Sequence, residues 1–223
     1  MSDETFIAQS NFIFESKSKE YEDMNLGIDR MSLAINAMGD PCKETPAIHI
    51  AGTNGKGSIC AFINSVLSLV NIKTGVSTSP HLVDWVERIC INKTPISKEE
   101  FQSLSLSLAP IAKKYSLTPF ESIIAIALKY FTLREVELLI LEVGLGGRLD
   151  ATTAHQYRPI IAFGAVGLDH CEYLGNSLEK VAIEKAAVIT TKSTVITAPQ
   201  HNIVKRVFEE TAKRKQALSL IHI

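Results

Sequence analysis

The chain has 223 residues and lacks an excess of charge, a long apolar run and any CxxC pair of cysteines. Its 23 Lys and Arg residues nearly balance 24 Asp and Glu residues, which argues against a nucleic-acid partner. No run approaches the ~20 apolar residues that cross a membrane, so we expect no membrane partner. The four cysteines are scattered, which favours free thiols in a reducing compartment over disulfides. These absences predict a soluble globular protein of the cell interior.

The first residues also lack the pattern of a targeting segment. They read MSDETFI, with acids and without a basic n-region, which argues against a signal peptide and an Arg-rich transit peptide. We therefore expect a cytoplasmic location and leave a mitochondrial one open. Residues 1–25 are rich in Ser, Lys and Glu with isolated aromatics, and we interpret them as a loose N-terminal leader.

What the sequence does contain is an alternation of apolar strands and helical patterns. With 46% hydrophobic residues the chain can bury a core, and apolar runs such as residues 137–143 are typical of parallel strands covered on both faces. We therefore predict an α/β fold with a mainly parallel sheet and helices on both faces. The patterns predict strands at residues 47–51, 73–77, 137–143, 160–166 and 194–198, and helices at residues 26–38, 58–70, 97–115, 119–131, 178–188 and 202–215.

A glycine-rich segment between the first strand and the next helix is the sharpest local motif. Residues 49–58 read HIAGTNGKGS, and their glycines allow a tight turn that aims backbone N–H groups at an anion. Lys56 would supply positive charge to phosphates, and Ser58 a hydroxyl near Mg²⁺. The motif departs from GxxxxGK[ST], because Ile50 replaces the first glycine and Gly57 separates the lysine from the serine. The alternative is an ordinary glycine-rich turn.

Polar side chains follow other predicted strands at their carboxyl ends, where α/β sheets bind ligands. Glu142 could hold Mg²⁺ on ATP, or be an exposed strand-end carboxylate. His170 could bind a metal, although a lone histidine is more often structural. Ser79 could contact Mg²⁺ or substrate, or belong to a Ser-Pro turn, and Asp150 could bind substrate or cap a turn.

Lys185 lies inside a predicted apolar helix. A lysine in such a place usually extends its ammonium group to solvent. Helical spacing puts Val181 and Ala182 beside it, so partial burial is the alternative. A buried lysine can lose its proton and become reactive.

These motifs occur in a fixed order along the chain: GTNGKGS, TSPHL, ERI, FE, EVGLGGRLDAT, LDH and EKA. The series resembles the folylpolyglutamate synthase and dihydrofolate synthase family of the Mur ligase superfamily, from about residue 26 to about residue 198. The resemblance implies a P-loop domain of the Mur ligase central-domain type. In the family, a C-terminal α/β domain adds ATP contacts and the glutamate site.

The resemblance also implies an activity and a set of site residues. These enzymes use MgATP to join L-glutamate to dihydropteroate or folate through an acyl-phosphate intermediate. It implies ATP contacts at Asn54, Gly55, Lys56, Gly57 and Ser58, and magnesium ligands at Ser58, Ser79, Glu142 and His170. It implies catalytic roles for Lys56, His170 and a carbamylated Lys185, and pterin-substrate contacts at Thr118, Pro119, Phe120, Glu121, Leu149, Asp150 and Ala151.

Two features depart from the family pattern. Thr153 stands where the family usually has Asn after DAT, which is a small change in a loop. Residues 218–223 read LSLIHI, which we interpret as a truncated and not necessarily native end after an ATP-binding domain at residues 26–217. On this interpretation the C-terminal ligase domain is absent, and we expect the fragment alone to be inactive. The alternative is a catalytically silent nucleotide- or folate-binding module.

Within the family, the motifs favour some members over others. Asn54 favours the dihydrofolate or bifunctional type, and TSPHL with LGGRLDAT disfavours a ligase acting on cell-wall peptides. We expect a monomer whose partners are small molecules, namely dihydropteroate or folate together with L-glutamate.

Overall fold

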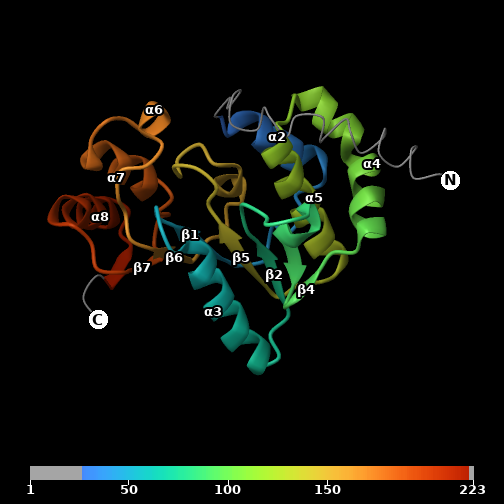
Figure 1. Cartoon of the computed structure of the whole chain (residues 1–223), viewed down its shortest axis with the longest axis horizontal. Helices are drawn as coiled ribbons and strands as arrows, with labels where there is room; N and C mark the ends of the chain where they lie inside the picture. The colour runs from blue at the N-terminus through green and yellow to red at the C-terminus, as the bar shows by residue number, and fades with distance from the viewer. Residues whose placement is uncertain (1–26, 221–223) are drawn as a thin grey trace.

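One eight-stranded sheet forms the centre of the molecule (Figure 1), in a computed structural model that describes residues 27–220. The strand order is β4-β3-β2-β5-β1-β6-β7-β8, and all neighbours from β2 to β8 pair in parallel. The β2–β3 and β3–β4 pairs are antiparallel, so β3 runs against the other strands. The strands are β1 (Ala47–Ala51), β2 (Thr74–Ser77), β3 (Ile89–Ile91), β4 (Thr94–Pro95), β5 (Leu138–Glu142), β6 (Ile160–Phe163), β7 (Thr194–Thr197) and β8 (Leu218–Leu220).

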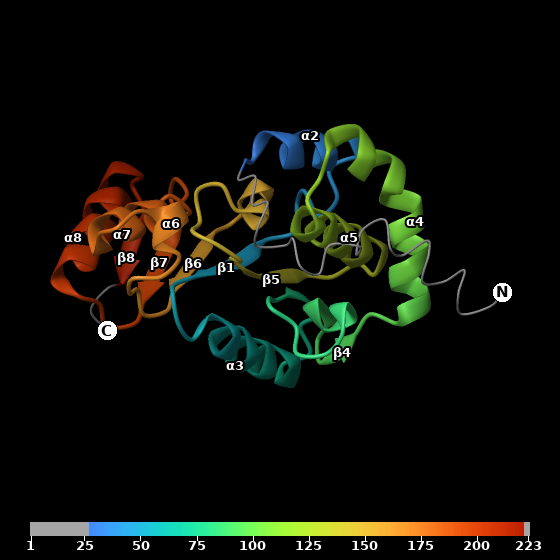
Figure 2. The ribbon, with the colours of Figure 1, turned by 45° about the horizontal axis from the view of Figure 1, so that its top comes forward.

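Helices cover both faces of this sheet, as predicted, but unequally (Figure 2). The long helix α3 lies on one face, and α2, α4 and α5 lie on the other. The helices are α2 (Asp29–Ala37), α3 (Lys56–Leu69), α4 (Lys98–Tyr115), α5 (Pro119–Leu133), α6 (Cys171–Leu174), α7 (Leu178–Ala186) and α8 (Asn202–Arg214), with 3₁₀ turns η1 (Trp85–Arg88) and η2 (Ala151–Ala154). Within residues 27–220, no helix is both long and apolar enough to cross a membrane.

The alternation of side chains along the strands explains this layering. In β1, Ile48 and Ile50 belong to the cluster beneath α3, whereas Ala47 and Ala51 face the opposite side. On that opposite side, the α2–α4–α5 cluster packs on β5, and the α7–α8 cluster packs on β6 and β7. Phe163 of β6 stacks on Phe208 of α8 with ring centroids 4.1 Å apart. The two halves of this layer meet over β1.

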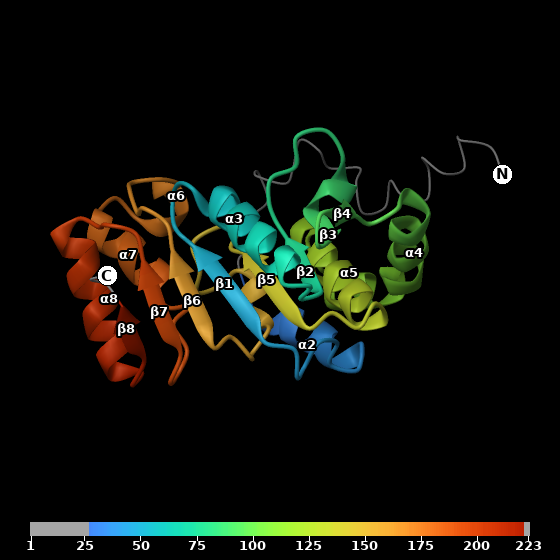
Figure 3. The same cartoon turned by 90° about the horizontal axis from the view of Figure 1, so that it is seen from below.

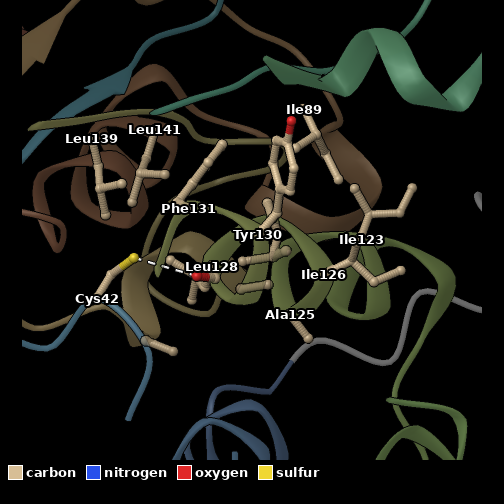
Figure 4. Packing of buried hydrophobic residues seen from close by; sticks show 14 of the residues in the cluster. Cys42, Ile89, Ile123, Ala125, Ile126, Leu128, Tyr130, Phe131, Leu139 and Leu141 are labelled. Carbon is tan, nitrogen blue, oxygen red and sulfur yellow. Dashed lines mark hydrogen bonds between the residues drawn. The ribbon is translucent and has the colours of Figure 1, made fainter. Parts of the chain in front are cut away.

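The packing of α5 on the sheet is especially close (Figure 4). Ile123, Ile126 and Phe131 of α5 share one cluster with Leu139 and Leu141 of β5. At Gly75 of β2, an added Cβ atom would lie 2.7 Å from the Phe131 ring, so only glycine fits there. The glycine in this strand therefore sets the distance between helix and sheet.

Each predicted strand and helix has a counterpart in the structure, with ends shifted by a few residues. Residues 1–26 and 221–223 lie outside the described part of the chain. The loose leader falls in that outside part. Sequence reasoning missed β3, β4, α6 and both 3₁₀ turns. Ser97 followed by Glu100 is typical of a capping box, which is only half formed at the start of α4: Ser97 accepts the N–H of Glu100, but the Glu100 carboxylate pairs with Arg134.

Candidate active site

The glycine-rich loop lies at the carboxyl end of β1, as predicted. β1 ends at Ala51, and α3 begins at Lys56, two residues earlier than the sequence pattern indicated. Gly55 is the N-cap of α3 and has φ +80°, a left-handed conformation that glycine adopts without strain. Asn54, Gly55, Gly57 and Ser58 are exposed, so the helix N-terminus faces solvent with free space for an anion.

A second loop, residues 164–167 after β6, holds the first one in place. The N–H groups of Thr53 and Asn54 donate to the carbonyl of Ala165 at 2.9 and 3.2 Å. The Thr53 hydroxyl bridges both the carbonyl and the N–H of Gly167, at 3.1 Å each. A Cβ atom at Gly164 would lie 2.4 Å from the carbonyl oxygen of Asn54, so that position requires glycine. The two loops therefore form one unit.

Two lysine side chains meet at the carbonyl oxygen of Gly52. Lys56 is half-buried, and its Nζ donates to the carbonyls of Gly52 and Thr53 at 3.3 and 3.2 Å. Lys185 of α7 is only 4% exposed, and its Nζ donates to the same Gly52 carbonyl at 2.8 Å. Lys185 is thus fully buried, beyond the partial burial that the sequence allowed. Burial, and then the charge of Lys56, lower the pKa of Lys185 to about 8.

Glu142 stands at the end of β5 and faces the glycine-rich loop. Its carboxylate is 5% exposed and accepts the backbone N–H of Ser79 at 3.1 Å, so the structure brings two of the predicted magnesium ligands together. A Cβ atom at Gly57 would lie 3.8 Å from Oε2 of Glu142. Burial raises the pKa of Glu142, although the Ser79 N–H and Lys56 oppose the rise. A carboxylate with hydroxyls beside an anion-binding loop fits Mg²⁺, which takes few protein ligands plus phosphate oxygens.

His170 is the predicted magnesium ligand that follows β6. It starts the short α6 with φ +47°, and its Nε2 and Nδ1 lie 3.5 and 3.9 Å from carboxylate oxygens of Asp169 and Glu172. Among residues 27–220, no three His, Cys, Asp or Glu side chains gather in a way that could hold a metal ion. His170 thus contacts carboxylates of its own loop, and its role as a magnesium ligand stays a prediction.

The predicted pterin contacts on α5 surround the start of that helix. Thr118 is the N-cap and forms a full capping box with Glu121. Glu121 is buried and also accepts from Nε of Arg30 in α2 at 2.9 and 2.8 Å, so its oxygens are already engaged. Pro119 occupies the first helical turn, and the ring of Phe120 covers Gly144, where a Cβ atom would lie 2.7 Å from the ring.

The remaining predicted contacts belong to the loop after β5. Asp150 caps η2 through the N–H of Thr152 at 2.9 Å, and its other oxygen accepts the N–H groups of Gly144 and Leu145 at 2.9 and 3.0 Å. Burial raises the pKa of Asp150 against these hydrogen bonds. Turn capping, one of the two roles that the sequence leaves open, is present, and substrate binding by Asp150 stays a prediction. Leu149 is half-buried and Ala151 is buried beside it.

Glycine at position 147 lets this loop approach α7. A Cβ atom there would lie 2.9 Å from the carbonyl oxygen of Glu184 and 3.2 Å from Cα of Lys185. Arg148 extends the contact, because its N–H donates to the Glu184 carbonyl and its guanidinium pairs with the Glu184 carboxylate at 3.0 Å. The loop after β5 therefore positions the helix that carries Lys185.

Comparison with known proteins agrees with this geometry, although no family model matches the chain. It is 38% identical over 196 residues to a dihydrofolate synthetase of Saccharomyces cerevisiae, covering 85% of this chain and 46% of the relative. It is 36% identical over 199 residues to a dihydrofolate synthase/folylpolyglutamate synthase of Bacillus subtilis, covering 86% and 46%. The chain belongs to the dihydrofolate synthase and folylpolyglutamate synthase family. It spans about half the length of the curated relatives it matches.

Solved structures of similar proteins superpose on nearly the whole chain. Folylpolyglutamate synthase of Mycobacterium tuberculosis complexed with ADP and AMPPCP superposes with a TM-score of 0.85 at 29% identity, covering 95% of this chain and 50% of that one. E. coli FolC in complex with DHPP and ADP superposes with a TM-score of 0.86 at 30% identity, with the same coverage. The predicted P-loop α/β fold of the Mur ligase type is therefore confirmed for this family member.

Sequence reasoning missed the residues of this family member that support the glycine-rich loop. In the sequence Thr53 is only one residue of the glycine-rich motif, and no motif includes Gly164 or Ala165. Gly164 lies inside the strand predicted at residues 160–166, and a glycine within a strand pattern is the signal that could have indicated close backbone approach.

Proposed function

We propose that this chain forms the nucleotide-binding part of an ATP-dependent ligase that joins L-glutamate to dihydropteroate, to folate, or to both. The observation that carries the proposal is the convergence of Lys56 and Lys185 on the Gly52 carbonyl, next to the buried carboxylate of Glu142. An exposed helix N-terminus with cationic side chains and a nearby carboxylate suits a magnesium-bound triphosphate. The relatives that share the fold carry names for this same pair of activities.

Two chemical steps make up the proposed reaction. The acceptor carboxylate attacks the γ-phosphorus of ATP, which forms an acyl phosphate and releases ADP. The amine of glutamate then attacks the acyl carbon, which forms the amide and releases phosphate and a proton. The first step brings two anions together, so charge neutralisation and in-line positioning dominate its barrier. Lys56 and the N–H groups at Gly55 and Gly57 would supply part of that neutralisation.

Magnesium fits the residues at the end of β5. Ser58, Ser79 and Glu142 would hold the ion, and we keep His170 as a proposed further ligand. When bound, the ion would neutralise charge on the phosphate oxygens. Glu142 must be ionised for this role, and the Ser79 N–H and Lys56 both favour its ionised form.

We further propose that Lys185 is the carbamylated lysine of the family. Carbamylation joins a neutral Nζ to CO₂ and releases a proton, so it requires an amine that has lost its charge. With a pKa of about 8, roughly a tenth of Lys185 is neutral at pH 7, far more than for an ordinary lysine. The product is an anion, which would relieve the repulsion between Lys185 and Lys56.

The acceptor would lie between the start of α5 and the loop after β5. Phe120 and Gly144 already touch across this gap, and the proposed contacts are Thr118, Pro119, Phe120, Glu121, Leu149, Asp150 and Ala151. Because Glu121 and Asp150 are engaged internally, we propose that they shape the acceptor site through their neighbours. We propose a monomer located in the cytoplasm.

A competition assay tests the proposal. The protein encoded by the whole reading frame is incubated with MgATP, labelled L-glutamate, dihydropteroate and tetrahydrofolate, and the labelled products are separated. We expect ATP-dependent transfer of label to at least one acceptor. Nucleotide binding by calorimetry without any transfer of label would overturn the ligase and support the silent binding module.

A further inference from the structure

A chain of buried polar side chains runs beneath the site, from β1 to the loop after β5. His49 in the middle of β1 is 0% exposed and lies between Leu141 of β5 and Ile161 of β6 in the sheet. Its Nε2 lies 2.8 Å from Oγ1 of Thr152, and its Nδ1 lies 3.2 Å from Nη1 of Arg158. Both ring nitrogens therefore have partners in a place where an apolar residue would be the usual choice.

The chemistry of the partners fixes the direction of every hydrogen bond. A guanidinium has donors only, so Arg158 donates and Nδ1 of His49 accepts. The imidazole must then carry its proton on Nε2, which donates to the Thr152 hydroxyl. That hydroxyl donates in turn to Oδ1 of Asp150, which already accepts the Thr152 N–H. Burial and the nearby Arg158 keep the imidazole neutral, because both lower the pKa of His49.

The series of hydrogen bonds thereby connects the charged side chains of Arg158 and Asp150 through the neutral side chains of His49 and Thr152. Arg158 is 6% exposed and Asp150 is 4% exposed, and the charge of Asp150 opposes the lowering of the pKa of Arg158 by burial. Oδ2 of Asp150 accepts the N–H groups of Gly144 and Leu145, which lie directly beyond Glu142 and Val143. Movement of Asp150 would therefore move the turn that follows the magnesium-binding strand.

We propose that His49 is a positioning residue, which as the Nε2–H tautomer holds Asp150 through Thr152 and so fixes the Gly144–Leu145 turn beside Glu142. It touches neither nucleotide nor acceptor. The step from this turn to catalysis rests on the proposed function, whereas the hydrogen-bond chain itself does not.

Two substitutions at His49 separate the roles of its nitrogens. His49→Gln places an amide N–H near the position of Nε2 and keeps the bond to Thr152, whereas His49→Asn keeps an acceptor for Arg158 and loses that bond. Thr152→Val removes the hydroxyl at nearly constant volume, and Thr152→Ser restores it. Backbone amide exchange at Gly144 and Leu145 is measured in all four variants, with exchange of core amides in β6 as the reference for global unfolding.

We expect His49→Asn and Thr152→Val to speed exchange at Gly144 and Leu145 by roughly tenfold relative to the β6 amides, and His49→Gln and Thr152→Ser to stay near wild type. In wild type, nitrogen NMR of the imidazole should show the proton on Nε2 over the neutral pH range. In the ligase assay, the affected variants should raise KM for the acceptor more than KM for ATP.

Equal acceleration of all amides in every variant would overturn the proposal, because it would mean that His49 only supports packing. A proton on Nδ1, or a charged imidazole in wild type, would also overturn it, and this measurement does not depend on the variants folding. A wild-type protein with the expected tautomer and amide protection but no ligase activity would contradict the proposed function alone.

Discussion

At the scale of single residues, the unusual feature is that two ammonium groups share one carbonyl oxygen. Nζ of Lys185 and Nζ of Lys56 lie 2.8 and 3.3 Å from the oxygen of Gly52. Like charges this close repel, and the charge of Lys56 is one cause of the lowered pKa of Lys185. An anion bound at the loop, or a carbamate on Lys185, would reduce the repulsion. The unliganded arrangement is therefore prepared for negative charge.

Replacement of Lys56 by alanine tests the phosphate-binding role of this loop. We expect Lys56→Ala to weaken binding of a non-hydrolysable ATP analogue by about 10- to 100-fold, the loss for one charged hydrogen bond, and to abolish glutamate ligation. Calorimetry with magnesium present measures the affinity. Lys213→Ala on the exposed side of α8 is the matched control and should bind normally. Unchanged affinity in Lys56→Ala would remove the phosphate-loop assignment.

The buried charge of Lys185 should make stability depend on pH. The pKa falls from 10.5 to about 8 on folding, so between these pH values the unfolded chain binds more protons and the unfolding free energy rises with pH. Below pH 8 the full cost is about 3 kcal/mol, of which the hydrogen bond to Gly52 offsets ~1 kcal/mol. In CO₂-free buffer, Lys185→Met should therefore stabilise the protein by about 2 kcal/mol at pH 7, and the gain should disappear as the pH approaches 10.5.

Denaturant unfolding of this variant and wild type across that pH range measures the difference. Lys180→Met, on the exposed side of the same helix, should show no such pH dependence. A gain for Lys185→Met that stays constant with pH would contradict the titration of Lys185 and point to better packing alone.

At the scale of helices and strands, Glu121 joins the start of α5 to α2. Its carboxylate accepts the Thr118 N–H at 2.7 Å and the Arg30 Nε at 2.9 and 2.8 Å. Glu121→Gln presents an amide N–H to Arg30 and leaves that cation poorly compensated, so we expect a loss of about 2–3 kcal/mol of unfolding free energy. Glu99→Gln on the exposed first turn of α4 should cost less than ~0.5 kcal/mol. Weaker acceptor binding at unchanged stability would instead assign Glu121 a direct substrate contact.

The contact between β2 and α5 offers a second test at this scale. Gly75→Ala places a methyl group within 2.7–2.9 Å of the Phe131 ring, and we expect it to cost about 1–3 kcal/mol of unfolding free energy. Phe131→Leu alone removes ring atoms from a fully buried position and should also destabilise. The double variant should lose clearly less than the sum of the two, because the smaller side chain makes room for the methyl. Additive losses would mean that the helix simply moves away.

These elements also show how far the sequence predicts the fold. β1 and β5 are found to within about two residues because both sheet faces are covered, so apolar runs mark them. β3 and β4 are missed because three and two residues are too short to show a period. The start of α4 shows a further limit, because Arg134, which is distant in sequence, pairs with the carboxylate of Glu100 and no local pattern indicates this contact.

The site divides in a similar way between local and long-range information. Glycines around Lys56 and a carboxylate after a strand are local signals, and the sequence finds them. That Lys185 reaches Gly52, 133 positions away in the chain, is a tertiary contact with no local signal. The engagement of Asp150 by backbone N–H groups and of Glu121 by Arg30 is equally invisible in a pattern, so the sequence leaves both as candidate substrate contacts.

At the scale of the whole molecule, the site lies where the order of strands reverses (Figure 3). β1 is paired on one side with β5 and on the other with β6, so the chain passes over β1 between these two strands. Where the strand order of a parallel sheet reverses, the loops that follow the neighbouring strands run in opposite directions. A crevice therefore forms at the carboxyl ends of these strands, and ligands bind there. Here the loops after β1, β5 and β6 are joined by hydrogen bonds and by Lys185. Both helical clusters on that face thus contribute to one site.

This arrangement predicts that a nucleotide stabilises the molecule as a unit. With magnesium present and ADP at about 100 times its Kd, mass action should raise the unfolding free energy by about 2.7 kcal/mol. Amide exchange should slow most in residues 52–58, 142–147 and 164–167, which lie at the same edge of the sheet, and least in β8 and α8. Removal of magnesium with EDTA should weaken the protection, and Lys56→Ala should reduce the rise in unfolding free energy to about 0.4–1.4 kcal/mol at the same ADP concentration. Because Lys185 and the Thr53–Gly167 bonds tie the three loops together, protection limited to residues 52–58 would show that they respond separately and would contradict a single site.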